Sequence, residues 1–177
     1  GAQAAVYAVT TEHPTIGVLA TSATVRSDVY SKYIGQLRPL SNTIEIACPE
    51  FVPLVESEQI DSPAALRACE IAMKPLLEAN ADAVILGCTH FPLLLPTLKK
   101  VAPKVLFIEP AQAVALQVAQ LIKSTFTDSA MPESNFAMPD DTYFASGSTE
   151  ILHRWIMSLM QPDTPPEIQP APVFRLP

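Results

Sequence analysis

The chain has 177 residues, of which 49% are hydrophobic and 16% are charged, and its formal net charge is −7. This length is sufficient for one large domain or two small ones with a real core. An acidic chain without a basic stripe is a poor candidate for binding nucleic acid. The sequence has no uninterrupted apolar run of about 18 residues and no secretory signal at its start, so we expect no membrane association.

The three cysteines, Cys48, Cys69 and Cys88, bear on the redox compartment. Their number is odd, they form no CxxC pair, and no histidine lies at the spacing of a zinc site. We therefore expect no structural disulfide and no metal site. A reducing, cytoplasmic location is the simplest interpretation.

Apolar and β-branched segments alternate with segments of helical spacing along the first two thirds of the chain. Residues 1–9 have the composition of a helix body, and helices are predicted over 25–34, 63–79 and 96–101. Pro75 is expected to kink or split the second of these. Strands are predicted over 15–21, 43–47, 82–87 and 105–108. The alternation indicates an α/β protein with a mainly parallel sheet.

The last third of the chain is predicted to hold a long helix over 111–126 and a loop over 127–139. A short strand over 142–146 and a helix ending near residue 160 follow. Residues 161–177 are rich in proline and poor in apolar side chains, a composition typical of an extended tail.

Polar residues follow three of the predicted strands: residues 21–24, residues 48–49, and Gly87-Cys88-Thr89-His90. Reactive groups of doubly wound sheets gather at the carboxyl ends of the strands. In the last segment we expect Gly87 to let the backbone turn sharply, so that Cys88 faces a cleft. Pro92 is expected early in the next helix, which leaves backbone amides free to point back into the site.

Cys88 is the residue to which this pattern gives a chemical role. A free thiol titrates near ~8.5, and a histidine or a helix start beside it favours the thiolate, which acts as a nucleophile or a base. The alternative is a structural cysteine, because free cysteine is among the most buried residue types. That alternative is favoured for Cys48 and Cys69. On spacing alone, Glu56 is a solvated carboxylate, and Thr21 and Thr24 are explained by a helix cap.

The segment Gly87-Cys88-Thr89-His90-Phe91-Pro92 resembles the second cysteine motif of the glutamate racemases. Residues 20–25 and 48–56 resemble the same family in the same order and spacing, and residues 108–111 and 144–147 match it more loosely. The resemblance covers about residues 1–160. It implies a three-layer α/β sandwich with a parallel sheet, of the Asp/Glu racemase type.

The resemblance also implies an isomerase that needs no cofactor and supplies D-glutamate for peptidoglycan. In that family two cysteines flank the substrate α-carbon, and each acts as acid or base on one face. By position, Cys88 is the base acting on L-glutamate, His90 orients or assists it, and Glu56 polarises His90. The substrate's carboxylates and amine are held by Thr21, Thr24 and the backbone of Thr89 and His90.

The chain departs from the family in its N-terminal part. It lacks the family's Asp-Ser-Gly loop, its Pro-Tyr-Gly segment and its first cysteine in a Cys-Asn-Thr context. We therefore expect one complete α/β domain over 10–92, a remnant of the partner domain over 1–9 and 93–160, and a tail over 161–177. The isolated chain is expected not to racemise glutamate. The remnant is expected to expose apolar surface, which favours self-association, with a homodimer as one form.

Three alternatives remain open from the sequence. An aspartate or hydantoin racemase of the same superfamily has the same motifs, although His90 and the segment 48–56 favour glutamate. A non-catalytic binding remnant of a racemase fits the missing start equally well. A cysteine hydrolase with a Cys88–His90 pair is disfavoured, because no oxyanion-stabilising device is evident.

Overall fold

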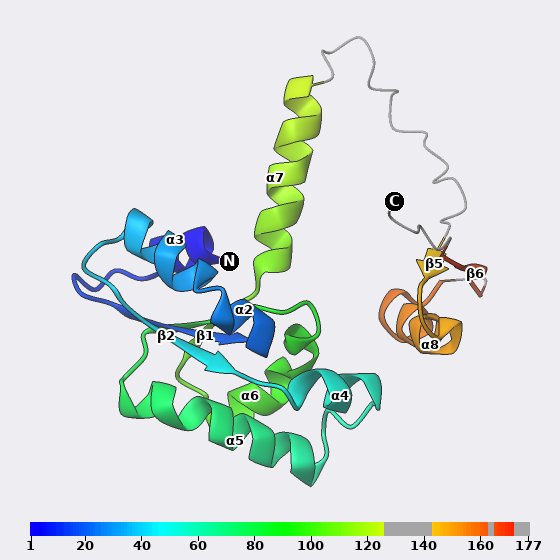
Figure 1. Cartoon of the computed structure of the whole chain (residues 1–177), viewed down its shortest axis with the longest axis horizontal. Helices are drawn as coiled ribbons and strands as arrows, with labels where there is room; N and C mark the ends of the chain where they lie inside the picture. Colours follow the sequence, from blue (N-terminus) through cyan, green and yellow to red (C-terminus); the bar gives the residue numbers. More distant parts are fainter. Residues whose placement is uncertain (126–142, 163–164, 172–177) are drawn as a thin grey trace. The chain divides into compact units, whose positions relative to one another are not determined.

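The computed structural model describes residues 1–125, 143–162 and 165–171, which belong to two compact units divided after residue 125. Four parallel strands form the sheet of the first unit (Figure 1). They lie in the order β2-β1-β3-β4, with bounds β1 Thr15–Ala20, β2 Asn42–Ala47, β3 Ala83–Leu86 and β4 Leu106–Ile108. β3 is buried along its whole length, and β1 along all but Thr15, as expected of strands covered on both faces.

Helices cover both faces of this sheet, which gives the predicted three-layer α/β architecture (Figure 1). One layer holds α1 Ala2–Ala8, α2 Ser22–Arg26 and α3 Val29–Leu37. The other holds α4 Phe51–Glu56, α5 Pro63–Glu78 and α6 Leu95–Val101. The chain moves from β1 to β2 and then back past β1 to β3, so right-handed crossovers place the two sets of helices on opposite faces.

α5 lies very close to the centre of the sheet. A Cβ on Gly17 of β1 would come within 2.8 Å of Leu76 Cδ1. The absence of a side chain on Gly17 leaves room for this approach, and the α5 side chains facing the sheet, including Met73 and Leu76, are fully buried.

α1 packs into the core of the first unit. Ala5 and Val6 belong to one buried cluster with Ile16 of β1, Ile34 of α3 and Ile85 of β3. The expected helix over 1–9 is therefore confirmed. Its assignment, with 93–160, to a partner domain distinct from 10–92 remains a prediction.

The single helix expected over 25–34 is wrong, because two helices occupy this stretch. α2 ends at Arg26 and α3 begins at Val29, and Asp28 between them has the left-handed conformation, with φ of 53°. Aspartate tolerates this conformation better than most residues. The apolar spacing continues through the break, so periodicity alone does not reveal it.

Pro75 does not split α5, which runs unbroken from Pro63 to Glu78. A proline at this position removes the hydrogen bond to the carbonyl of Ile71. Ile71 is exposed, so water can satisfy that carbonyl, and the buried side chains hold the helix against the sheet.

The C-terminal elements are α7 Pro110–Thr125, β5 Tyr143–Ala145, α8 Thr149–Met160 and β6 Ile168–Pro170. The loop expected over 127–139 lies outside the described residues. An extended tail from residue 161 is only partly correct, because β6 pairs in parallel with β5. Gln161, with φ of 46°, ends α8 and redirects the chain. None of the helices in the described ranges is long and apolar enough to cross a membrane.

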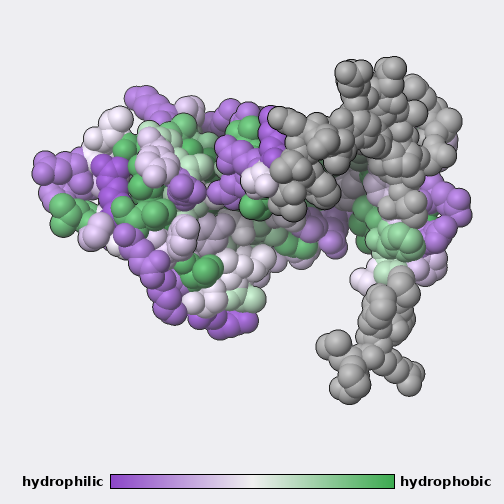
Figure 2. Space-filling view, turned by 90° about the horizontal axis from the view of Figure 1, so that it is seen from above, coloured by the Kyte–Doolittle hydropathy of each residue, from purple (hydrophilic) through white to green (hydrophobic). Residues whose placement is uncertain are grey.

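Hydrophobic side chains also reach the surface of the described part. Figure 2 shows hydrophobic patches interrupted by hydrophilic ones on the face that it presents. The exposed apolar residues include five on α7, which are Val114, Leu116, Val118, Leu121 and Ile122.

Candidate active site

The carboxyl ends of β1 and β3 meet where the strand order reverses direction. β1 leads to β2 on one side, whereas β3 and β4 lie on the other. Such a switch point in an open parallel sheet is where ligands bind. Leu19 pairs with Leu86, so Thr21 and Cys88 are the residues that leave the two adjacent strand ends.

A chain of three polar side chains starts at Cys88. Its Sγ lies 3.9 Å from His90 Nδ1, and His90 Nε2 lies 3.3 Å from Glu56 Oε1. Cys88 is half-buried, and the His90 and Glu56 side chains are 34% and 45% exposed. The thiol, the imidazole and the carboxylate thus form one continuous chain of polar contacts. The three residues that the resemblance singled out are therefore brought together.

Aromatic packing explains why Glu56 reaches His90 from a segment 34 residues earlier in the chain. Phe51 at the start of α4 and Phe91, directly after His90, are both buried, with ring centroids 4.9 Å apart in an edge-to-face arrangement. Phe91 begins the 3-10 turn Phe91–Leu94, which packs against α4. The last residue of α4 is Glu56, so this packing brings the helix that carries the carboxylate against the segment that carries the imidazole.

The structure adds a second reason for glycine at position 87. No glycine among the described residues has a positive φ, so Gly87 is not needed for a left-handed turn. It is needed for space: an added Cβ would lie 3.0 Å from the Leu19 carbonyl oxygen, 3.2 Å from Ala20 Cβ and 3.3 Å from Tyr30 Cε2. A side chain at this position would press on the Leu19 carbonyl and its neighbours as the chain leaves β3.

Thr21 and Thr24 lie across the switch point from Cys88. Thr21 is the N-cap of α2 and accepts a hydrogen bond from the Thr24 backbone N–H at 3.4 Å. The two hydroxyls are hydrogen-bonded to each other at 3.0 Å. Helix capping therefore accounts for Thr21, as its residue type alone predicts, and a role in substrate binding remains a prediction for both threonines.

Thr89 and His90 contribute backbone groups to the same edge. The N–H groups of the following residues Phe91 and Leu93 are used within the turn, where they donate to the carbonyls of Cys88 and His90. Among the described residues, the N–H groups of Thr89 and His90 have no such partner. These two amides are available to an anionic ligand.

The other two cysteines have a different chemistry. Cys48 and Cys69 are buried, and burial raises the pKa of Cys48 to about 12 and that of Cys69 to about 11. Both thiols are therefore protonated and unreactive at neutral pH. No cluster of metal-ligating side chains occurs in the described ranges.

Tyr30 is a neighbour of the site that the sequence did not single out. Its spacing on the helix indicated only an apolar position, and the ring does pack against the core cluster. The same ring also covers Gly87, directly before Cys88. No sequence pattern predicts this contact, which depends on the break between α2 and α3.

The family described as Asp/Glu/Hydantoin racemase matches residues 2–118 of the chain. The chain belongs to this family. A glutamate racemase of Synechococcus sp. (strain CC9605) is 46% identical over 118 residues, which are 66% of this chain and 44% of the relative. One from Lactiplantibacillus plantarum is 35% identical over 153 residues, 84% of this chain and 54% of the relative.

Solved structures of glutamate racemases share the fold. The Bacillus anthracis isoform superposes with a TM-score of 0.81 at 24% identity, over 97% of this chain and 62% of that one. For the Thermus thermophilus enzyme the TM-score is 0.70 at 27% identity, over 96% and 59%. The chain thus spans about half the length of the curated relatives described above, and less than two thirds of these solved chains.

Proposed function

We propose that the chain carries one of the two acid/base groups of a glutamate racemase, and that Cys88 is this group. The observation that carries the proposal is the chain of contacts from Cys88 through His90 to Glu56 at the switch point of the sheet. The relatives named glutamate racemase favour glutamate over aspartate or a hydantoin as substrate.

In the proposed reaction, the Cys88 thiolate takes the α-proton of L-glutamate and becomes a thiol. The electron pair of the broken C–H bond is delocalised into the α-carboxylate. A second acid on the opposite face then donates a proton to the α-carbon and gives D-glutamate. In the reverse direction, the Cys88 thiol donates the proton, and His90 and Glu56 stabilise the thiolate that remains.

The substrate's charged groups are assigned to the residues around this thiol. The free N–H groups of Thr89 and His90 suit a carboxylate, because backbone amides at a turn bind anions. Thr21 and Thr24 supply hydroxyls on the other side of the switch point. These contacts hold the α-carbon between Cys88 and the second acid.

The 177-residue chain is proposed not to racemise glutamate by itself. Inversion needs a proton donor on each face of the α-carbon, with the two acidities nearly matched. Neither Cys48 nor Cys69 meets this requirement, since both are buried and have pKa values of about 12 and 11.

Protection of Cys88 from alkylation tests the substrate assignment. Iodoacetamide labelling of each cysteine is followed by mass spectrometry with L-glutamate, D-glutamate or L-glutamine present. We expect both enantiomers of glutamate to slow labelling of Cys88, and L-glutamine to have little effect. Equal protection by glutamine, or none by glutamate, would contradict the proposal.

The remaining assignments concern the setting of the protein. The family resemblance favours a cytoplasmic protein that supplies D-glutamate for peptidoglycan. The exposed apolar residues of α7 favour self-association. Sedimentation velocity tests this directly, since a homodimer dissociates on dilution.

A further inference from the structure

Tyr30 lies against the residue that precedes Cys88. Its Cε2 atom is 3.3 Å from the position that a Cβ on Gly87 would occupy. The ring is half-buried and packs on the cluster that contains Ala20 and Ile85, from the two strands that meet at the switch point. The ring and the strand ends therefore enclose the backbone from which the thiol projects.

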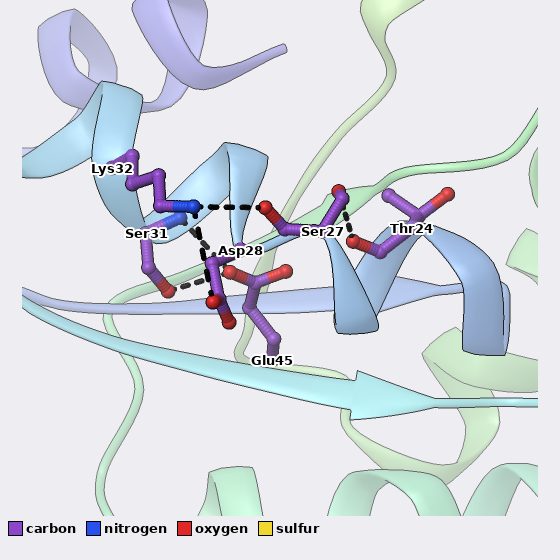
Figure 3. A network of polar contacts seen from close by, with 6 residues as sticks. All are labelled: Thr24, Ser27, Asp28, Ser31, Lys32 and Glu45. Atoms are coloured by element: carbon purple, nitrogen blue, oxygen red, sulfur yellow. Dashed lines mark hydrogen bonds and ion pairs between the residues drawn. The ribbon is translucent and has the colours of Figure 1, made fainter.

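Hydrogen bonds between Glu45 of β2 and Ser31 of α3 hold the helix turn that carries Tyr30. Glu45 Oε1 accepts hydrogen bonds from the backbone N–H of Ser31 at 2.9 Å and from its hydroxyl at 2.5 Å (Figure 3). The other oxygen, Oε2, is buried and has no hydrogen-bond partner. The two bonds to Oε1 tie the start of α3 to β2, directly beside Tyr30.

Ser27 and Asp28, the two residues between α2 and α3, also make polar contacts with the neighbouring helices. The Lys32 ammonium donates to the Ser27 carbonyl at 3.2 Å and lies 3.9 Å from an Asp28 carboxylate oxygen (Figure 3). The Ser27 hydroxyl donates to the Thr24 carbonyl at 2.6 Å. These bonds connect α2 and α3 across the break, from Thr24 on one side to Ser31, next to Tyr30, on the other.

The surroundings of Tyr30 keep its phenol neutral. Burial raises the pKa of Tyr30, and negative charge at the nearby Glu45 and Cys88 raises it further. The tyrosine is therefore no rival acid to Cys88, and its contribution lies in the placement of the ring.

We propose that Tyr30 is a positioning residue for Cys88, because its ring holds the Gly87–Cys88 backbone so that the thiol stays beside His90. The inference rests on the proposed role of Cys88 as the working thiol. It concerns thiol geometry, however, so it is tested without racemase turnover and its failure is distinguishable from failure of the proposed substrate.

The experiment measures how strongly His90 affects the alkylation rate of Cys88, in the unaltered chain and in variants of Tyr30. The rate of Cys88 alkylation by iodoacetamide is compared before and after His90→Gln, in the unaltered chain and in Tyr30→Leu and Tyr30→Phe. Tyr33→Leu is the matched control, because Tyr33 lies on the same helix and is 50% exposed. Circular dichroism verifies that each variant is folded.

In the unaltered chain and in Tyr33→Leu, His90→Gln is expected to slow alkylation about threefold or more, as for other contacting side chains. In Tyr30→Leu the same change is expected to have less than about half that effect, and Tyr30→Phe, which keeps the ring, is expected to restore it. A simple loss of stability would not remove the dependence on His90 selectively.

Two results would overturn the proposal: an undiminished effect of His90 in Tyr30→Leu, or no effect of His90 in the unaltered chain. If Tyr30→Leu does not fold, Ser31→Ala replaces it. This variant deletes the hydroxyl bond to Glu45 and leaves the ring intact. It is expected to weaken the coupling partially, and unchanged coupling there would likewise overturn the proposal.

Discussion

The environments of the three cysteines differ at the scale of single residues. Cys88 is half-buried beside an imidazole, whereas Cys48 and Cys69 are buried. The same functional group is thus a candidate base at one position and an inert packing group at the other two. The difference comes from burial and neighbours, which the residue type does not reveal.

Glu56→Gln tests the chain of contacts at this scale. Removing the carboxylate removes the contact that holds the His90 ring beside Cys88. We expect alkylation of Cys88 at neutral pH to slow about two- to fivefold, a modest effect because the pair is partly exposed. Glu50→Gln is the control, since Glu50 lies at the other end of the same helix and makes no side-chain cap bond. An equal effect of both substitutions would contradict the assignment.

The buried thiols predict how stability depends on pH. An unfolded cysteine titrates near ~8.5, whereas burial raises the pKa of Cys48 to about 12 in the folded chain. Above pH ~9 the unfolded state loses this proton and the folded state keeps it, so the stability falls as the pH rises.

The loss approaches about 1.4 kcal/mol per pH unit for each such thiol. Urea unfolding between about pH 8 and pH 10 is expected to show a shallower decline for Cys48→Ala than for the unaltered chain. Parallel declines would contradict the burial of this thiol.

At the scale of elements, the strands that carry the site could be predicted from sequence. The apolar, β-branched run at 15–21 and the run at 82–87 match β1 and β3 within a residue or two, because both are covered on two faces. The break at Asp28 was not predictable, since the apolar spacing continues through it. Tertiary bonds such as that from Ser31 to Glu45 determine it.

At the candidate site, too, some contacts could be predicted from the sequence and others depend on tertiary packing. Cys88 and His90 are only two residues apart in the sequence, so their proximity follows from the motif itself. Spacing alone predicted a solvated Glu56, and only the family resemblance pointed to its contact with His90. That contact depends on the packing of Phe51 against Phe91, which local sequence does not encode.

Alanine substitution at Gly87 and at Gly35 compares a tightly packed glycine with an open one. Gly87→Ala is expected to destabilise the fold by about 1–3 kcal/mol, because the new methyl group meets the Leu19 carbonyl and neighbouring side chains. Gly35→Ala, in α3 with no atom within 4 Å of the new Cβ, is expected to stabilise it by about 0.5–1 kcal/mol. Urea midpoints measure both, and effects of the same sign would contradict this account of Gly87.

At the scale of the whole molecule, the chain holds a family fold but spans about half of its curated relatives. The described ranges provide one half-buried thiol beside a histidine and a carboxylate, and two thiols that burial keeps inert. Under the proposed function, one such thiol can remove and return the α-proton of glutamate but cannot invert the α-carbon. Proton exchange requires one acid/base group, whereas racemisation requires two.

The most direct test follows the α-proton of L-glutamate by NMR in deuterated water with the 177-residue chain. The account predicts that this proton is replaced by deuterium while the L configuration is kept, because Cys88 returns a deuteron to the face from which it took the proton. Cys88→Ala is expected to abolish the exchange. Formation of D-glutamate by the chain alone, absence of exchange, or exchange that survives Cys88→Ala would contradict it.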